Sequence, residues 1–230
     1  MRTTAVGIEQ RFAETYADAL RLPLAPLRAR PAAAIDLALK RILDIGLSLA
    51  LIAFIAPFLL LVALLIRIDS AGPALFRQTR LGLGGRPFDI LKFRTMNVLE
   101  NGNRVVQATR NDPRVTRLGR FLRQTSIDEL PQLLNVLRGE MSLIGPRPHA
   151  RAHDAYYGAV IDGYNERQQM KPGITGWAQV NGFRGETPTI DCMRDRVAHD
   201  LWYVRHFDFA LDLKILALTL FEVARPRNAH

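Results

Sequence analysis

Apolar residues are concentrated in one long segment near the beginning of the chain. No charge interrupts the 22 residues from Ile45 to Ile66, which lie between Asp44 and Arg67. About 20 apolar residues are enough for a helix to cross the hydrocarbon core of a bilayer. A soluble helix that is apolar on every face would need protein on every side, which a chain of 230 residues can hardly provide. The pattern therefore predicts a membrane helix over residues 36–68.

The position of this segment excludes a signal peptide. It follows 44 residues that include several acids. It is also longer than the roughly 7 to 15 apolar residues of a cleaved signal. We expect the mature chain to keep it.

Positive charges flank the segment on both sides. They are Lys40, Arg41, Arg67, Arg77 and Arg80. Since basic residues favour the cytoplasmic side of a membrane, both ends of the segment are expected there. Pro57, near the middle, removes a helical hydrogen bond and supplies a bend. We expect a re-entrant helix, with Ser48 or a neighbouring helix serving the carbonyl that Pro57 frees.

After the membrane segment the pattern changes to short β-prone runs. The stretch 74–96 contains two such runs separated by glycines at positions 82, 84 and 85, which predicts a β-hairpin. These glycines do not form a P-loop, because no Gly-Lys-Ser/Thr follows them.

Amphipathic helices are predicted in three other places. Residues 6–22 carry apolar residues at spacings of four, ahead of a proline-rich linker at 22–34. Between residues 114 and 123 an arginine recurs at every third position beside an apolar stripe. This is typical of a helix in the headgroup layer of a membrane, with a solvated face as the alternative. Residues 211–224 fit either a surface helix or a core helix.

Two adjacent acids, Asp128 and Glu129, lie among many arginines where a helix is predicted to begin. The arginines are Arg117, Arg120, Arg123, Arg138 and Arg147. Buried carboxylates need a cation nearby, and acids with arginines and a divalent metal suit phosphate chemistry.

The alternative for this acid pair is structural. Ser126 and Glu129 fit the S-x-x-E capping box at a helix start. Pro131 weakens that assignment, because as the fifth helical residue it would remove a ladder hydrogen bond. In the other arrangement the site is strained, or Asp128 lies free at a helix N-terminus.

Residues 172–185 hold four glycines and a proline among apolar residues. This pattern predicts a loop held close to its surroundings rather than a regular element. Gln179 and Arg184 are candidate ligand contacts there, and Trp177 is expected to pack rather than to stack on a sugar.

Composition narrows the class further. The net charge of +9 suits nucleic acid, anionic lipid or phosphorylated substrates, and the membrane segment favours the last two. Cys192 is the only cysteine, which excludes an internal disulfide and a cysteine-based zinc site and fits a reducing compartment. His149 and His153 have no evident third metal ligand, so we expect them on the surface.

Five motifs follow one another in order. They are KFRTM at 92–96, DPRVTRLGRFLR at 112–123, SIDELPQLLNVLRGEMSLIGPRP at 126–148, KPGITGWAQVNG at 171–182 and LDLKIL at 211–216. Together they resemble the bacterial sugar transferases, the monotopic polyprenyl-phosphate phosphoglycosyl transferases. The resemblance covers roughly residues 36–223.

The resemblance and the patterns together imply an α/β, mostly α, membrane-associated fold. Its expected parts are an N-terminal extension and linker (1–35), the re-entrant membrane helix (36–68), a cytosolic catalytic domain with a β-hairpin and interfacial helices (69–223), and a C-terminal tail (224–230).

Members of this family move a sugar 1-phosphate from a nucleotide diphosphate sugar to a polyprenyl phosphate. The resemblance implies such an enzyme on the cytoplasmic face of the bacterial inner membrane. Its expected partners are a UDP-sugar, polyprenyl (undecaprenyl) phosphate and anionic lipids, without nucleic acid. NGFRGET at 181–187 resembles members that use UDP-glucose or UDP-galactose to begin exopolysaccharide synthesis. A monomer and a homodimer both stay open.

The resemblance also implies roles for single residues. Asp128 is the expected nucleophile, acting through an aspartyl phosphosugar intermediate, and Glu129 is expected to hold Mg²⁺. The expected substrate contacts are Lys92, Arg94, Arg123, Arg147, Gln179 and Arg184.

Two other classes stay open beside this enzyme. A membrane-attached nucleic-acid-binding protein would fit the charge, but the chain has no recognisable motif for it. A noncatalytic membrane scaffold of a glycan assembly complex would also fit the membrane segment.

Overall fold

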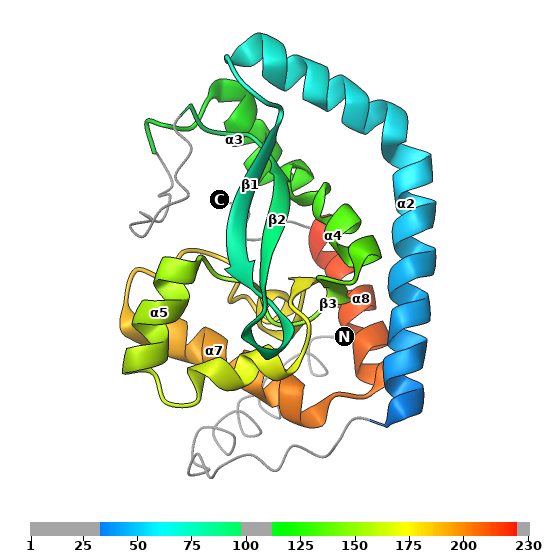
Figure 1. Cartoon of the computed structure of the whole chain (residues 1–230), viewed down its shortest axis with the longest axis vertical. Coiled ribbons are helices and arrows are strands. Elements are labelled where there is room, and N and C mark those ends of the chain that lie inside the picture. Colours follow the sequence, from blue (N-terminus) through cyan, green and yellow to red (C-terminus); the bar gives the residue numbers. More distant parts are fainter. Residues whose placement is uncertain (1–32, 98–111, 225–230) are drawn as a thin grey trace, which may run out of the picture.

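The longest element is α2 (Ala34–Asp69), which runs along one side of the molecule (Figure 1). The computed structural model describes residues 33–97 and 112–224, so the helix predicted at 6–22 and nearly all of its linker lie outside it. By length and composition α2 is able to cross a membrane, and only 11% of its most apolar window of 18 residues is buried. It is therefore not the core helix of a soluble domain.

The helix α2 bends near Pro57, where its blue half gives way to its cyan half (Figure 1). The predicted bend is therefore present. Ser48 does not stabilise it by hydrogen bonding, because its buried Oγ has no hydrogen-bond partner among the described residues. Phe54, Leu60 and Ile68 are 85%, 73% and 74% exposed, as suits a surface facing lipid.

The predicted hairpin is confirmed. Strands β1 (Leu75–Leu81) and β2 (Pro87–Phe93) pair antiparallel over their whole length. Their connection contains Gly84 and Gly85 with φ of 63° and 73°, a left-handed conformation that glycine adopts at little cost.

Short helices follow the hairpin. They are α3 (Arg117–Gln124), a 3-10 helix (Ile127–Glu129) and α4 (Gln132–Arg138). The first begins later than the arginine pattern predicts, because Arg114 lies before it.

The guanidinium of Arg114 contacts Asp112, with Nη2 donating to Oδ2 at 2.7 Å. Thr116 then begins α3 as its N-cap, accepting a hydrogen bond from the backbone N of Gly119. The side chain of Phe121 is 54% exposed on α3, which agrees with an interfacial helix.

Residues 172–185 are more regular than predicted. Strand β4 (Gly173–Thr175) pairs in parallel with β3 (Ser142–Ile144), and one helical turn, α6 (Trp177–Val180), follows. The expectation that Trp177 packs is confirmed, since it is 8% exposed and stacks on Trp202 at 4.8 Å between ring centroids.

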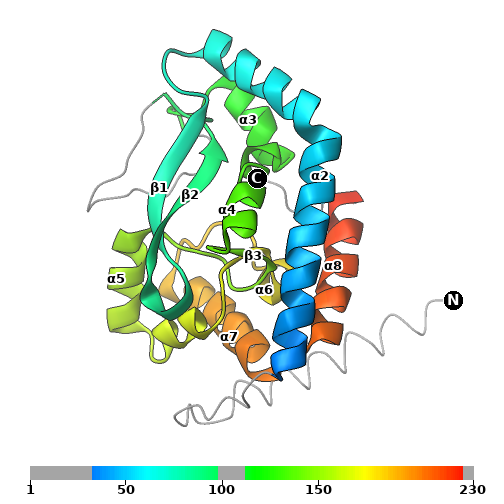
Figure 2. The same cartoon turned by 45° about the vertical axis from the view of Figure 1, so that its right-hand side comes forward.

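The remaining elements of the described ranges are a 3-10 helix in the hairpin connection (Leu83–Gly85), α5 (Arg151–Val160), a second 3-10 helix (Tyr164–Gln169), α7 (Ile190–His206) and α8 (Phe209–Ala224). Helix α8 lies beside α2 (Figure 2). Its Asp212 and Ile215 are fully buried whereas its Leu220 is 66% exposed. The C-terminal helix therefore has both a core face and an exposed apolar face.

The main hydrophobic core joins the hairpin, α4, β3, α7 and α8. Its most buried members are Ile90, Val136, Met141, Ile144, Tyr203 and Ile215. Leu43, Leu47, Ile52 and Ile55 of α2 pack against it. The first half of α2 is thus part of the folded domain, and the acid pair lies in the domain beside it.

Candidate active site

The acid pair lies on the 3-10 helix Ile127–Glu129. This helix directly follows Ser126, whose backbone has a left-handed conformation. Ser126 has φ 60° and ψ 16° and makes no side-chain capping bond. The capping-box alternative is therefore wrong. Helix α4 begins only after Pro131, which occupies the N-cap and so removes no ladder hydrogen bond.

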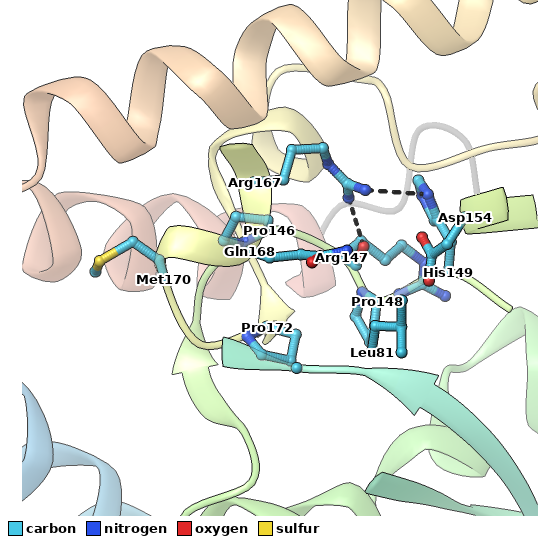
Figure 3. Close-up of a pocket in the computed structure, with 11 residues that line it drawn as sticks. Leu81, Pro146, Arg147, Pro148, His149, Asp154, Arg167, Gln168, Met170 and Pro172 are labelled. Carbon is cyan, nitrogen blue, oxygen red and sulfur yellow. Dashed lines mark hydrogen bonds between the residues drawn. The ribbon is translucent and has the colours of Figure 1, made fainter. Parts of the chain in front are cut away.

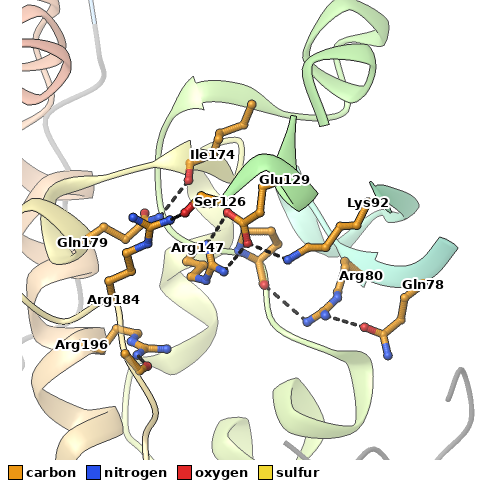
Figure 4. A network of polar contacts seen from close by, with 12 residues as sticks. Gln78, Arg80, Lys92, Ser126, Glu129, Arg147, Ile174, Gln179, Arg184 and Arg196 are labelled. Carbon is orange, nitrogen blue, oxygen red and sulfur yellow. Dashed lines mark hydrogen bonds and ion pairs between the residues drawn. The ribbon is translucent and has the colours of Figure 1, made fainter. Parts of the chain in front are cut away.

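Two cations clamp Glu129 (Figure 4). Its Oε1 accepts from Lys92 Nζ at 2.7 Å and from Arg147 Nη2 at 2.6 Å, and its Oε2 accepts from Arg147 Nη1 at 3.2 Å. Burial alone would raise the pKa of Glu129, but Arg147 and Lys92 outweigh it and hold the pKa well below its ordinary value. Glu129 is therefore ionised at neutral pH.

Asp128 is the other half of the pair and has a different environment. It is 8% exposed. Burial and the adjacent Glu129 raise its pKa to about 6, against the opposing effect of Lys92, Arg123 and Arg147. The carboxyl group is therefore mostly ionised at neutral pH and becomes protonated as the pH falls through about 6. Two adjacent acids whose pKa values separate in this way are typical of a catalytic site.

Arg147 lies on the loop 145–148, which close backbone contacts hold in place. The backbone N of Gly145 donates to Thr175 O at 2.9 Å, and that of Gly173 donates to Pro146 O at 3.0 Å. A Cβ atom on Gly173 would overlap the backbone N of Gly145. Glycines at both positions therefore permit the approach that sets the loop.

Helix α2 also holds this loop, through Lys40 and Asp44, for which the sequence predicted no such contact. Lys40 Nζ donates to Ile144 O at 2.8 Å and to Asp212 Oδ2 at 2.6 Å. Asp44 Oδ1 accepts from Ser142 Oγ at 3.0 Å and from Leu143 N at 2.8 Å. Both ends of β3, the strand directly before the loop 145–148, therefore hydrogen-bond to side chains of α2.

The structure brings some of the other predicted contacts to the acid pair. Arg123 lies close enough to lower the pKa of Asp128. Arg184 donates to Ser126 Oγ, two residues before Asp128. Gln179 donates to Ile174 O at 2.8 Å, and its Oε1 is buried without a described partner.

Arg94 is not brought to the acid pair. Its guanidinium donates to the backbone oxygens of Ile66, Ser70 and Ala71, at and after the end of α2. These contacts favour a structural role, because they satisfy carbonyl groups that the end of a helix leaves free.

The prediction that His149 lies on the surface is wrong. It is 7% exposed, and its Nδ1 lies 2.6 Å from the hydroxyl oxygen of Tyr164, which donates to Asp154 at 2.7 Å. Burial and then the nearby Arg167 lower the pKa of His149 well below its ordinary value, so the ring is neutral.

Arg167 is a residue that sequence analysis missed. It is 5% exposed, contacts Asp200 at 2.8 Å and donates through Nη2 to the backbone oxygen of Arg147 at 2.6 Å. Arg147 is therefore held at its backbone by Arg167 and at its side chain by Glu129. No local pattern marks Arg167, because its partners lie far away along the chain.

A shallow cleft opens beside Arg147 (Figure 3), lined in part by His149, Asp154, Arg167 and Gln168. Its volume of about 20 Å³ suits one water molecule. The donor substrate therefore cannot be enclosed there as the side chains stand.

A magnesium site is chemically compatible with the acid pair. The described residues contain no group of three or more acids, histidines or cysteines that could bind a metal by themselves. Mg²⁺, however, commonly binds one or two carboxylates together with substrate phosphates and water. Glu129 Oε2 accepts only one hydrogen bond among the described side chains, which leaves a lone pair for a metal.

Comparison with known proteins assigns the chain to a family. The family model for bacterial sugar transferases matches residues 35–226. The chain is 56% identical over 209 residues to the UDP-glucose:undecaprenyl-phosphate glucose-1-phosphate transferase of Caulobacter vibrioides, covering 91% of this chain and 78% of that protein. It is 51% identical over 201 residues to the Escherichia coli protein of the same name, covering 87% of this chain and 43% of that protein.

A third relative, the exopolysaccharide production protein PSS of Rhizobium leguminosarum, is 49% identical over 185 residues, which cover 79% of this chain and 92% of that protein. The chain thus spans less than half of the Escherichia coli relative and most of the other two. The chain belongs to the bacterial sugar transferase family.

Proposed function

We propose that the protein transfers glucose 1-phosphate from UDP-glucose to undecaprenyl phosphate, releasing UMP. Relatives at about half identity carry this activity in their names. A different UDP-hexose, UDP-galactose above all, is the second candidate for the donor. The product, a polyprenyl diphosphate sugar, would be the lipid on which an exopolysaccharide is begun.

One observation supports the proposal most strongly: the adjacent carboxyl groups of Asp128 and Glu129 have different environments. Asp128 has a pKa of about 6, whereas Glu129 is held ionised by Lys92 and Arg147. Among the described side chains the clamping cations hydrogen-bond to Glu129, which leaves Asp128 free to react. A noncatalytic scaffold would not need this division between adjacent acids.

In the first step the carboxylate of Asp128 attacks the phosphorus next to the sugar. A bond forms between an Asp128 oxygen and this phosphorus while the phosphoanhydride bond breaks, and UMP leaves with the bonding electrons. In the second step an oxygen of the polyprenyl phosphate attacks the same phosphorus. The Asp128 carboxylate is released and the lipid diphosphate sugar forms.

The cations of the site stabilise the charge that develops during both displacements. Arg147 is best placed, because backbone and side-chain contacts fix it against Glu129. Glu129, together with the substrate phosphates, would hold Mg²⁺. When bound, Mg²⁺ supplies further neutralisation of the phosphate oxygens, which is much of what a protein can contribute to phosphoryl transfer.

Helix α2 supports a location at the membrane. Its exposed apolar face and its basic ends support a membrane protein whose acid pair faces the cytoplasm, where nucleotide sugars are available. The packing of the first half of α2 on the core would hold the acid pair near the membrane surface, where the lipid phosphate is presented.

The test is UMP release by the purified protein from a panel of UDP-sugars, with Mg²⁺ and a polyprenyl phosphate. We expect UDP-glucose to be the best donor. If UDP-galactose is the best donor instead, the proposed reaction stands and the transferred sugar is galactose. If the well-folded protein releases no UMP from any donor, a noncatalytic scaffold is favoured. If such a protein binds nucleic acid instead, a membrane-attached nucleic-acid-binding protein is favoured.

A further inference from the structure

Two arginines near Arg147 have no role in the reaction as derived so far. Arg80 is the penultimate residue of β1, and Arg196 is a buried residue of α7 with 5% exposure. Figure 4 shows Arg147 between them. The three guanidinium groups come from a strand, a loop and a helix that are distant in the sequence, so no motif predicts their meeting.

The guanidinium groups of Arg80 and Arg196 have only neutral hydrogen-bond partners within the described ranges. Arg80 donates to Gln78 Oε1 and, at 3.4 Å, to Pro148 O, and Arg196 donates to Gly185 O. The Nε atoms of both arginines are buried without a described acceptor. Asp154 and Glu129 attract Arg80, and Asp200 attracts Arg196, without a hydrogen bond between them. A largely buried cation with no carboxylate in direct contact costs free energy, so this arrangement favours an anionic ligand.

None of the nearby acids hydrogen-bonds to Arg80 or Arg196 within the described ranges. Asp154 accepts from the hydroxyl of Tyr164 at 2.7 Å. Glu129 is clamped by Lys92 and Arg147, and Asp200 contacts Arg167. Burial and then repulsion by Arg147 lower the pKa of Arg80 and that of Arg196 to about 10 each. Both groups therefore stay charged at neutral pH, and the site holds an excess of positive charge.

We propose that Arg80, Arg147 and Arg196 form an anion cradle that binds the diphosphate of the donor nucleotide sugar. This inference rests on the proposed transfer reaction and adds two substrate-binding residues to it. A diphosphate brings two negative charges and several oxygens, which match the fork of donors on a guanidinium group. The cradle also holds the phosphate that leaves with UMP, where negative charge increases during the first step.

The loop 182–185 connects the cradle to the acid pair. Arg196 donates to the backbone oxygen of Gly185, while the adjacent Arg184 donates to Ser126 Oγ. One loop thus contacts both the cradle and the turn that carries Asp128. A diphosphate on Arg196 would lie within the same cluster as the nucleophile.

The experiment measures binding of UDP, which lacks the sugar and cannot react, to the full chain in nanodiscs by calorimetry. Arg80→Gln and Arg196→Gln are each expected to weaken UDP binding at least tenfold, or about 1.4 kcal/mol. Binding of uridine, which has no phosphate, is expected to be the same in all proteins.

Arg194→Gln is the matched control for these variants. It lies two residues from Arg196 on α7, in an exposed ion pair with Asp191 at 2.8 Å. We expect it to bind UDP with unchanged affinity. A loss in the cradle variants that is no larger than in this control overturns the proposal.

Farnesyl phosphate, a short polyprenyl phosphate, separates the two possible sources of the anion. The cradle variants are expected to bind it as the unaltered protein does. Normal UDP binding with weakened farnesyl phosphate binding would assign Arg80 and Arg196 to the acceptor and overturn the proposal.

A thermal measurement checks that the variants are folded. Removal of a charge with no carboxylate in direct contact is expected to leave the melting temperature unchanged or higher, and UDP is expected to raise it only in proteins with the cradle intact. If a glutamine variant fails to fold, Arg80→Lys and Arg196→Lys keep the charge and lose the fork, and a smaller loss of UDP affinity is expected.

Failure of the cradle proposal and failure of the proposed transfer reaction give different results in these measurements. UMP release by the unaltered protein together with normal UDP binding in the cradle variants overturns the cradle alone. Absence of both UMP release and UDP binding in the unaltered protein overturns the proposed function, and the cradle with it.

Discussion

Asp128 is the residue on which the proposed chemistry depends. Its folded pKa of about 6 lies above the ordinary value of 3.8, so its ionised form costs stability at neutral pH, and this cost diminishes as the pH falls from about 6 towards 3.8. Asp128→Asn is expected to reduce UMP release about a thousand-fold or more, because an amide has nearly the same shape as the carboxylate but is not a nucleophile. Its melting temperature should stay the same or rise by a few degrees. Substantial turnover in this variant would exclude Asp128 as the nucleophile.

The same pKa predicts how activity depends on pH. A protonated carboxyl is not a nucleophile, so the rate should fall as the pH drops through about 6. Because Arg123 lowers the pKa of Asp128, Arg123→Gln should move this acid limb to higher pH. Arg120→Gln, an exposed change on the same helix α3, serves as the control. Identical pH profiles for the two variants would contradict the assignment.

Replacing Glu129 by its amide should change the melting temperature in the opposite sense to the same change at Asp128. Glu129→Gln leaves Lys92 and Arg147 without their carboxylate, and breaking a buried ion pair typically costs about 3–5 kcal/mol. We expect a lower melting temperature, severely reduced UMP release and a steeper dependence of the remaining activity on Mg²⁺. A variant as stable as the unaltered protein would show that the clamp contributes little.

The residues of the candidate site could be predicted from the sequence more fully than the contacts around them. Asp128, Glu129, Lys92 and Arg147 lie in recognisable motifs, and the structure brings them together. The burial of His149 could not be predicted, because it depends on contacts with residues 15 and 18 positions further along.

At the scale of elements, local periodicity decided what could be predicted. The helix α2 and the hairpin carry strong patterns of their own. The pairing of β3 with β4 joins three-residue strands that lie about 30 residues apart in the sequence, and so short a strand shows no alternation. The loop 145–148 depends on this pairing, so its geometry could not be derived from the sequence.

The attachment of α2 to α8 is testable through Lys40. Lys40→Met leaves Asp212 buried without its cation, which typically costs about 3–5 kcal/mol, and it releases Ile144 before the loop 145–148. We expect a lower melting temperature and reduced UMP release. The double variant Lys40→Met with Asp212→Asn should regain stability, because no unpaired charge remains. Additive losses in the double variant would rule out this coupling.

At the scale of the whole molecule, the membrane path of α2 is the main prediction. Basic residues on both sides of the segment and the bend near Pro57 favour a re-entrant path. With Cys192 replaced by serine, single cysteines at Arg30 and Ser70 should both resist an impermeant thiol reagent in intact cells. Both should react once the membrane is opened. Labelling at position 30 alone from outside would mean that the chain spans the bilayer.

The ion pair between Lys40 and Asp212 sets an order of events during synthesis. The two residues are 172 positions apart, so at roughly 5–20 residues per second the ribosome needs about 10–30 s to deliver the partner of a lysine already at the membrane. Until α8 emerges, the nascent chain holds a cation that lacks its carboxylate and a catalytic loop that lacks its final support. A chain that stops before residue 212 would therefore keep α2 but lack the carboxylate that pairs with Lys40.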